Sequence, residues 1–248
     1  MKKTLLIGAL FASGTLFAQC DISNVEGAWE NVREDVDTQM DVTGPGIVGA
    51  CKLTVNSTSD NGDRARLRDR SPSCESSFRA SFIMNADSVG ALANNQRNKV
   101  YNFQCNSNLN GGAVDCANTG IGQFRLQGDD GSNILRSFVT DEGPATVADN
   151  RRKFDVPVGA GDQTFEIHWV RASAPGAADG IFKMWHSGNT TELNPNVQFT
   201  DLQNYNYCVD QVNLGLIQPT NGWVGNHAGK DLIFDEYESR RLSGITVN

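Results

Sequence analysis

Apolar and polar residues alternate with a period of two in many short stretches of the chain. Every second residue from Phe78 to Met84 is apolar, and Phe165, Ile167 and Trp169 form the apolar side of the stretch 165–170. Similar runs occur at 51–55, 100–105, 124–126, 134–140, 181–185, 209–217 and 231–237. Because successive side chains of a strand point to opposite faces, this pattern predicts half-buried β-strands.

Turn sequences separate these stretches. Asp-Gly, Gly-Gly or Asn-Gly pairs occur at 60–63, 110–112, 129–131 and 179–180, and such pairs supply the positive φ that tight turns need. No window has a convincing helical period, and we expect the segment 85–95 to be a long loop. The sequence therefore predicts an all-β antiparallel sandwich, with residues 19–248 as one domain.

The N-terminus has the features of a secretory signal peptide at residues 1–18. Lys2 and Lys3 precede a short apolar run, and the small residue Ala18 ends it. The run is too short to span a bilayer comfortably, so we expect no transmembrane segment. The sequence predicts a bacterial protein that is secreted or periplasmic.

Six cysteines in an exported chain predict three disulfides, since such chains fold in an oxidising compartment. Six cysteines allow fifteen pairings. Closeness in sequence favours Cys105–Cys116 and Cys51–Cys74, which leaves Cys20–Cys208 to fix the N-terminus.

The charge of the chain narrows the choice of partners. The net charge is −8, and removal of the signal peptide with its two lysines makes it −10. This acidic balance excludes a basic nucleic-acid-binding protein and weighs against polyanionic substrates, which a negative protein repels at long range. We expect a monomer.

Three stretches of the chain have a recognisable pattern: the run 68–82, the pair of strands in 165–185, and the segments 212–216 and 232–241, which end in Phe234-Asp235-Glu236-Tyr237-Glu238-Ser239-Arg240-Arg241. They resemble bacterial exported domains of the concanavalin-A-like lectin/glucanase superfamily. The resemblance implies a jelly-roll sandwich, to which the disulfides would be additions. It implies no single activity, because the superfamily includes lectins, hydrolases, lyases and proteins of unknown role.

The alternation also predicts which polar side chains point outward, away from the core. If their strands are neighbours, these residues form one polar surface that can bind a carbohydrate or an envelope glycan, and His168 is a chemically suitable base. Trp223 lies in a Gly-rich loop and is a candidate for stacking on a sugar. The candidate glycan-binding residues are Arg79, Gln123, Arg125, Glu166, His168 and Trp223.

Several functions remain open at this point. The favoured one is glycan binding without cleavage. The alternatives are a polysaccharide lyase or a glycoside hydrolase acting on the same face, and a structural or interaction protein of the envelope. The acidic stretch 235–238 lacks the spacing of a hydrolase strand and is interpreted as surface charge paired with Arg240 or Arg241. We expect no cofactor, although the turns at 60–63 and 129–131 offer oxygens for a weak structural calcium site.

Overall fold

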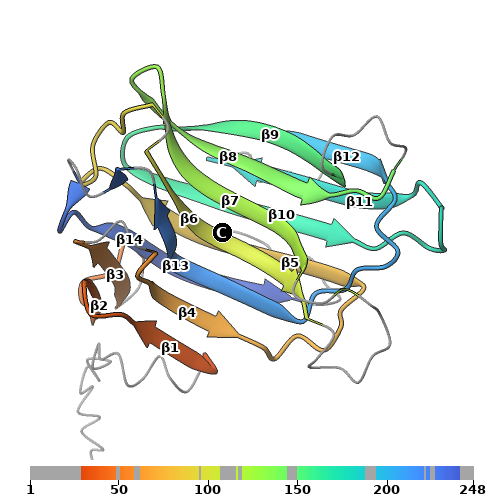
Figure 1. The fold of residues 1–248 in the computed structure, drawn as a ribbon, viewed down its shortest axis with the longest axis horizontal. Coiled ribbons are helices and arrows are strands. Elements are labelled where there is room, and N and C mark those ends of the chain that lie inside the picture. The colour runs from red at the N-terminus through yellow and green to blue at the C-terminus, as the bar shows by residue number, and fades with distance from the viewer. Residues whose placement is uncertain are drawn as a thin grey trace, which may run out of the picture.

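The computed structural model describes residues 29–48, 51–58, 62–94, 96–106, 116, 119–143, 150–187, 194–220, 222–223 and 227–240. Within these residues, fourteen β-strands form two antiparallel seven-stranded sheets that face each other (Figure 1). The predicted all-β sandwich is confirmed. The predicted signal peptide and Cys20 lie outside the described residues. No helix in the described part is long and apolar enough to cross a membrane.

Sheet A faces the viewer in Figure 1. Its strands, in spatial order, are β1 (Asn31–Glu34), β4 (Ala65–Asp69), β13 (Gln211–Thr220), β6 (Arg97–Cys105), β7 (Thr119–Asp129), β8 (Ser132–Thr140) and β9 (Arg151–Val158).

Sheet B lies behind it. Its order is β12 (Val197–Leu202), β11 (Gly180–His186), β10 (Asp162–Val170), β5 (Ser77–Asn85), β14 (Leu232–Arg240), β3 (Lys52–Ser57) and β2 (Thr38–Thr43).

The core lies between the sheets and is rich in aromatic rings. Phe82 of sheet B packs against Tyr101 of sheet A, with ring centroids 5.1 Å apart, and against Phe165 at 5.4 Å. Trp169 is fully buried, as the alternation predicts, and so are Phe78 and Phe82. Burial of these large side chains is the main driving force for the sandwich.

The predicted strands are present, and the structure adds five that were not predicted: β1, β2, β4, β9 and β12. Four of these are the edge strands of the two sheets, and β4 is next to an edge. An edge strand has fewer neighbours and carries more polar residues, so its apolar pattern is weak. At the β7–β8 turn, Asp130 and Gly131 have the positive φ expected of a tight hairpin.

The disulfides agree with the sequence prediction in part. Cys105–Cys116 is confirmed, but Cys74 pairs with Cys208 across 134 residues, so Cys51–Cys74 and Cys20–Cys208 are wrong. Cys51 is disulfide-bonded as well. The backbones next to Cys74 and Cys208 form a β-bridge at Glu75 and Val209, which brings the two cysteines together. Disulfides are typical of proteins in oxidising compartments, which is consistent with export.

Candidate functional site

The two sheets separate the residues that we expected on one polar surface. Gln123 and Arg125 lie on β7 of sheet A, whereas Arg79 lies on β5 and Glu166 and His168 lie on β10 of sheet B. All five belong to outward-facing positions, as the alternation predicts. They occupy opposite outer faces of the sandwich, however, so the condition for one surface, that the strands are neighbours, is met for β5 and β10 but not between them and β7.

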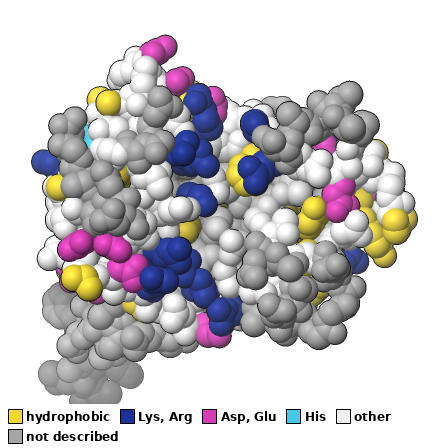
Figure 2. Space-filling view, viewed as in Figure 1, with side chains coloured by type: hydrophobic (Ala, Val, Ile, Leu, Met, Phe, Trp, Pro, Cys, Tyr) yellow, Lys and Arg dark blue, Asp and Glu magenta, His cyan; other side chains and the backbone are white. Residues whose placement is uncertain are grey.

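The outer face of sheet A carries a concentration of positive charge. Figure 2 shows it as a band of Lys and Arg side chains that crosses the strands from the top to the bottom of the view. We call four outward-facing residues of this face the central cations: Arg66 and Arg68 of β4, Lys99 of β6 and Arg125 of β7. Lys99 and Arg125 are direct cross-strand neighbours.

Irregularities in the strands place these groups on the same face. The register between β6 and β7 shifts between Lys99 and Tyr101, so Lys99 and Asn102 both point outward although they are three residues apart. On β13, Gly215 lies opposite Arg66 with φ of +119°, and a Cβ there would lie 2.5 Å from the carbonyl oxygen of Ala65. Only glycine fits this position. No side chain at position 215 therefore occupies the surface of β13 beside Arg66.

The central cations have no carboxylate partner among the described residues. The Nε of Arg66 is buried without a hydrogen-bond acceptor, and the whole residue is only 6% exposed. Burial, and then the charges of Arg68 and Arg64, lower the pKa of Arg66 to about 9. A buried cation without an anion is costly, so this arrangement favours a negatively charged ligand.

Lys99 and Arg125 are half-buried and also lie close to other cations. Burial, followed by the charge of Arg125, lowers the pKa of Lys99. Burial, followed by the charges of Arg97 and Arg151, lowers the pKa of Arg125. Two other cations of sheet A differ, because Arg33 pairs with Asp35 at 2.7 Å and Arg136 with Asp155 at 3.0 Å.

Amide side chains form a second row beside the cations, which we call the amide ladder. Asn213 accepts a hydrogen bond from Nε of Arg68 at 3.1 Å and donates to Asn102 at 2.8 Å. Gln211 donates to Gln104, which also accepts from Asn213 at 3.3 Å. Amides can donate and accept, so this row suits the hydroxyl groups of a sugar.

The same face lacks the usual proton-transfer groups of a lyase. None of the strands of sheet A carries an outward-facing His or Tyr in the described part: His168 and His186 belong to sheet B, and Tyr101 points into the core. Lys99, with its lowered pKa, is the one group among the central cations suited to accept a proton.

The outer face of sheet B contains a buried ion pair. The guanidinium of Arg79 donates to the carboxylate of Glu166, and both residues are buried. The same guanidinium lies 5.0 Å from the centroid of the Trp185 ring, which is 2% exposed. His168 lies between Arg79 and Lys183 and its Nε2 is 3.5 Å from Oγ of Ser77. This cluster is a closed ion pair rather than an open site.

Trp223 does not have the exposed position that we expected. Its ring is fully buried and lies 5.7 Å from the ring of His227. His227 is itself held by the carbonyl of Val89 at 2.9 Å and by Gln96 at 2.8 Å. Trp223 therefore belongs to the packing of this end of the molecule, since a stacking platform for a sugar needs an accessible ring face.

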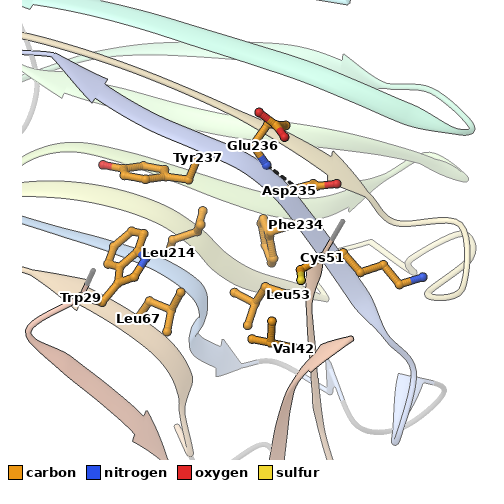
Figure 3. Close-up of a pocket in the computed structure, with 11 residues that line it drawn as sticks. Trp29, Val42, Cys51, Leu53, Leu67, Leu214, Phe234, Asp235, Glu236 and Tyr237 are labelled. Atoms are coloured by element: carbon orange, nitrogen blue, oxygen red, sulfur yellow. Dashed lines mark hydrogen bonds between the residues drawn. The ribbon is translucent and has the colours of Figure 1, made fainter. Parts of the chain in front are cut away.

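A cavity of about 210 Å³ lies between the sheets where β14 bulges (Figure 3). Glu236 has a φ of +46° at the bulge, and the two oxygens of Asp235 accept from the backbone N–H groups of Glu236 and Val48. Trp29 and Tyr237 line the cavity, with centroids 4.7 Å apart. Its walls are mainly side chains of the core, and it is open to solvent rather than enclosed.

The acidic stretch 235–238 gives no pair of catalytic carboxylates. Asp235 is bound to backbone N–H groups, and Glu238 pairs with Arg240 at 2.5 Å, as expected of paired surface charge. The simple alternation assumed for this stretch fails, because the bulge shifts the register between Asp235 and Glu238.

No protein-family model matches the sequence, and no curated protein matches it. Solved structures do match the fold. A PL-14 alginate lyase from Aplysia kurodai superimposes with a TM-score of 0.54 at 9% identity, covering 89% of this chain and 94% of the other. An alginate lyase from Pseudomonas aeruginosa gives 0.50 at 10% identity, covering 89% and 91%. This chain has the concanavalin-A-like jelly-roll fold.

Sequence reasoning missed most of the residues that this jelly-roll brings together on sheet A. Of the candidates, only Gln123 and Arg125 lie there. A signal for β4 is visible in the alternation of Arg64, Arg66 and Arg68 with Ala65 and Leu67. No local signal marks Lys99 or the amide ladder, because their common face depends on register shifts and on strands far apart in sequence.

Proposed function

We propose that this protein binds an acidic polysaccharide, with uronate sugars as the class of ligand, along the outer face of sheet A. The observation that carries the proposal is the buried Nε of Arg66, which has no hydrogen-bond acceptor among the described residues. Besides burial, the charges of Arg68, Arg64 and Arg33 lower its pKa further, and Asp35 opposes them by less than each of these. A carboxylate ligand would supply the missing acceptors through charge-assisted hydrogen bonds. The two alginate lyases of the same fold act on such a polymer, which supports this choice of ligand.

The net charge of −8 does not oppose this proposal. Long-range repulsion depends on total charge, but binding depends on the local potential at the surface. The positive band concentrates part of the basic residues on one face, so the local sign is opposite to the overall sign. The local positive potential can therefore attract a polyanion, although the acidic composition by itself weighs against one.

Titration calorimetry with an alginate oligosaccharide and with a neutral β-glucan oligosaccharide of equal length tests the proposal. We expect binding of the acidic oligosaccharide only, and a loss of about 10-fold to 100-fold in affinity for Arg125→Met, since a hydrogen bond to a charged group contributes about 1.5–3 kcal/mol. Equal affinity for both oligosaccharides, or no effect of the substitution, would contradict it.

Elimination by the same face is a second candidate function, carried by the lowered pKa of Lys99 beside Arg125. In that reaction Arg125 would neutralise the sugar carboxylate and Lys99 would remove the neighbouring proton. The glycosidic C–O bond would break with formation of a C=C bond, and the leaving oxygen would take up a proton.

The unsaturated product absorbs in the ultraviolet, which gives a direct assay. Lys99→Arg keeps the positive charge but cannot accept the proton, so it should retain binding and lose turnover by about 100-fold or more. If the wild-type protein binds the acidic oligosaccharide but ultraviolet absorbance does not rise, elimination is rejected and binding remains the proposed function.

A further inference from the structure

One aromatic side chain lies on the outer face of sheet A. Among the aromatic residues on the strands of this sheet, Tyr101, Phe103, Phe124 and Phe154 pack into the core. Phe138 lies on β8 between the inward-facing Ser137 and Val139, so its ring points outward, and it is half-buried. A half-exposed ring on a polar face offers a flat apolar surface that the apolar side of a ligand can cover.

The neighbours of Phe138 are polar and charged. Its cross-strand partners are Gln123 of β7 and Lys153 of β9. The guanidinium of Arg151, an exposed residue, lies 4.2 Å from the centre of the Phe138 ring. Burial is the largest cause of the lowered pKa of Lys99 and of Arg125, and the charge of Arg151 is a smaller cause in both cases. The aromatic ring and the central cations therefore share one continuous surface.

Phe138 also continues the amide ladder. Arg68, Asn213, Asn102 and Gln123 are successive cross-strand neighbours from β4 to β7, and Phe138 follows on β8. A chain of sugars lying across the strands would meet cations and amides first and then an aromatic surface. The apolar face of a pyranose ring stacks on such a surface.

We infer that Phe138 and Arg151 form a subsite for one pyranose ring of the acidic polysaccharide. The sugar ring stacks on Phe138, and Arg151 moves from the ring face to pair with the carboxylate of that sugar. Arg151 is exposed and long, so the movement needs no change in the backbone. This inference rests on the proposed function and adds that the site selects sugar rings and not merely negative charge.

A comparison of two polyanions tests the subsite. Calorimetry would use an alginate hexasaccharide and an inorganic polyphosphate of similar total charge, which has no sugar ring. We expect Phe138→Ala to lower the affinity for the hexasaccharide about 10-fold and the affinity for polyphosphate less than 2-fold, where 10-fold is 1.4 kcal/mol. Phe138→Leu keeps apolar volume but not the flat ring, and should give most of the loss. Circular dichroism and the thermal midpoint show that both variants are folded.

The role of Arg151 has its own readout. Arg151→Gln should weaken binding of the hexasaccharide, because the carboxylate loses its partner. If Arg151 merely covered the ring, the same substitution would strengthen binding, and that result would overturn its role. The stacking subsite would be overturned if Phe138→Ala lowered the affinity for both polyanions equally or lowered neither. Binding of the hexasaccharide by the wild-type protein would still support the proposed function in that case. A wild-type protein that binds no hexasaccharide would overturn both.

Discussion

The outer faces of the two sheets contain similar residue types in different electrostatic arrangements. On sheet B, Arg79 is buried against Glu166 and packs on Trp185. On sheet A, Arg66 is equally buried, at 6% exposure in both cases, but the nearby charges that act on it most strongly are those of Arg68 and Arg64, and it forms no ion pair within the described residues. A buried arginine can therefore stabilise the fold when a carboxylate of the chain pairs with it. Without such a pair, it is available to bind an anionic ligand.

This difference has a thermodynamic meaning. The ion pair on sheet B is satisfied within the folded chain, so its disruption harms the fold. The central cations on sheet A repel one another, and their removal relieves the folded state while it weakens anion binding. Substitution of the ion pair on sheet B should lower the free energy of unfolding. Substitution of a central cation on sheet A should leave that free energy unchanged or raise it while weakening anion binding, as expected when a functional site is held in an unfavourable state.

The largest expected effect is on sheet B. Glu166→Gln leaves Arg79 buried without this carboxylate and should lower the free energy of unfolding by about 3–5 kcal/mol in urea denaturation. Glu238→Gln, in the partly exposed pair with Arg240, is the matched control and should cost less than about 1 kcal/mol. A small effect of Glu166→Gln would mean that this pair does not hold sheet B together.

On sheet A, Arg66→Met should act on binding instead. The affinity for an alginate oligosaccharide should fall about 10-fold to 100-fold, since the guanidinium would contribute about 1.5–3 kcal/mol to a charged ligand. The free energy of unfolding should stay the same or rise, because methionine removes a buried charge and keeps the apolar stem. Calorimetry and urea denaturation measure the two quantities. A clearly destabilised variant would remove the contrast between the sheets.

Gln123→Glu would place a carboxylate on the same face of β7 as Arg125, so that sheet A, like sheet B, would have an acidic group close to a cation. We expect roughly a 10-fold loss of affinity for the acidic oligosaccharide, about 1.4 kcal/mol, from repulsion and from competition for the cations. Gln198→Glu adds the same charge on the exposed edge strand β12 of sheet B and should change the affinity less than 2-fold. Equal losses in both variants would show that net charge alone governs binding.

The smallest effect concerns pH. The pKa of Arg66 is lower in the folded protein, at about 9, than in the unfolded chain, so the unfolded chain binds more protons above pH 9. At neutral pH the charge of Arg66 therefore lowers the free energy of unfolding. This unfavourable contribution shrinks as the pH rises through 9, by at most about 1.4 kcal/mol per pH unit. The difference in unfolding free energy between Arg66→Met and wild type should narrow between pH 7.5 and 10. A difference that is constant with pH would contradict the unpaired state of Arg66.

Local patterns were enough for the central strands and the inward-facing positions. Phe78, Phe82 and Trp169 are buried where the alternation puts them, because a period of two fixes the face of each side chain within a strand. The edge strand β9 escaped prediction since its sequence is largely polar. Trp223 was misjudged, as its Gly-rich surroundings suggested a loop on the surface, whereas packing against His227 buries it.

The sequence by itself determined that this chain is an antiparallel sandwich and which side chains of its central strands point outward. It did not determine which sheet each strand joins, because strand pairing is a long-range property that the alternation cannot encode. Tertiary structure alone placed Arg79 and Arg125 on opposite faces, paired Cys74 with Cys208, and brought Lys99 and Asn102 to one side through a register shift. The candidate site exists only through these long-range contacts, which gather charges far apart in the chain onto one face.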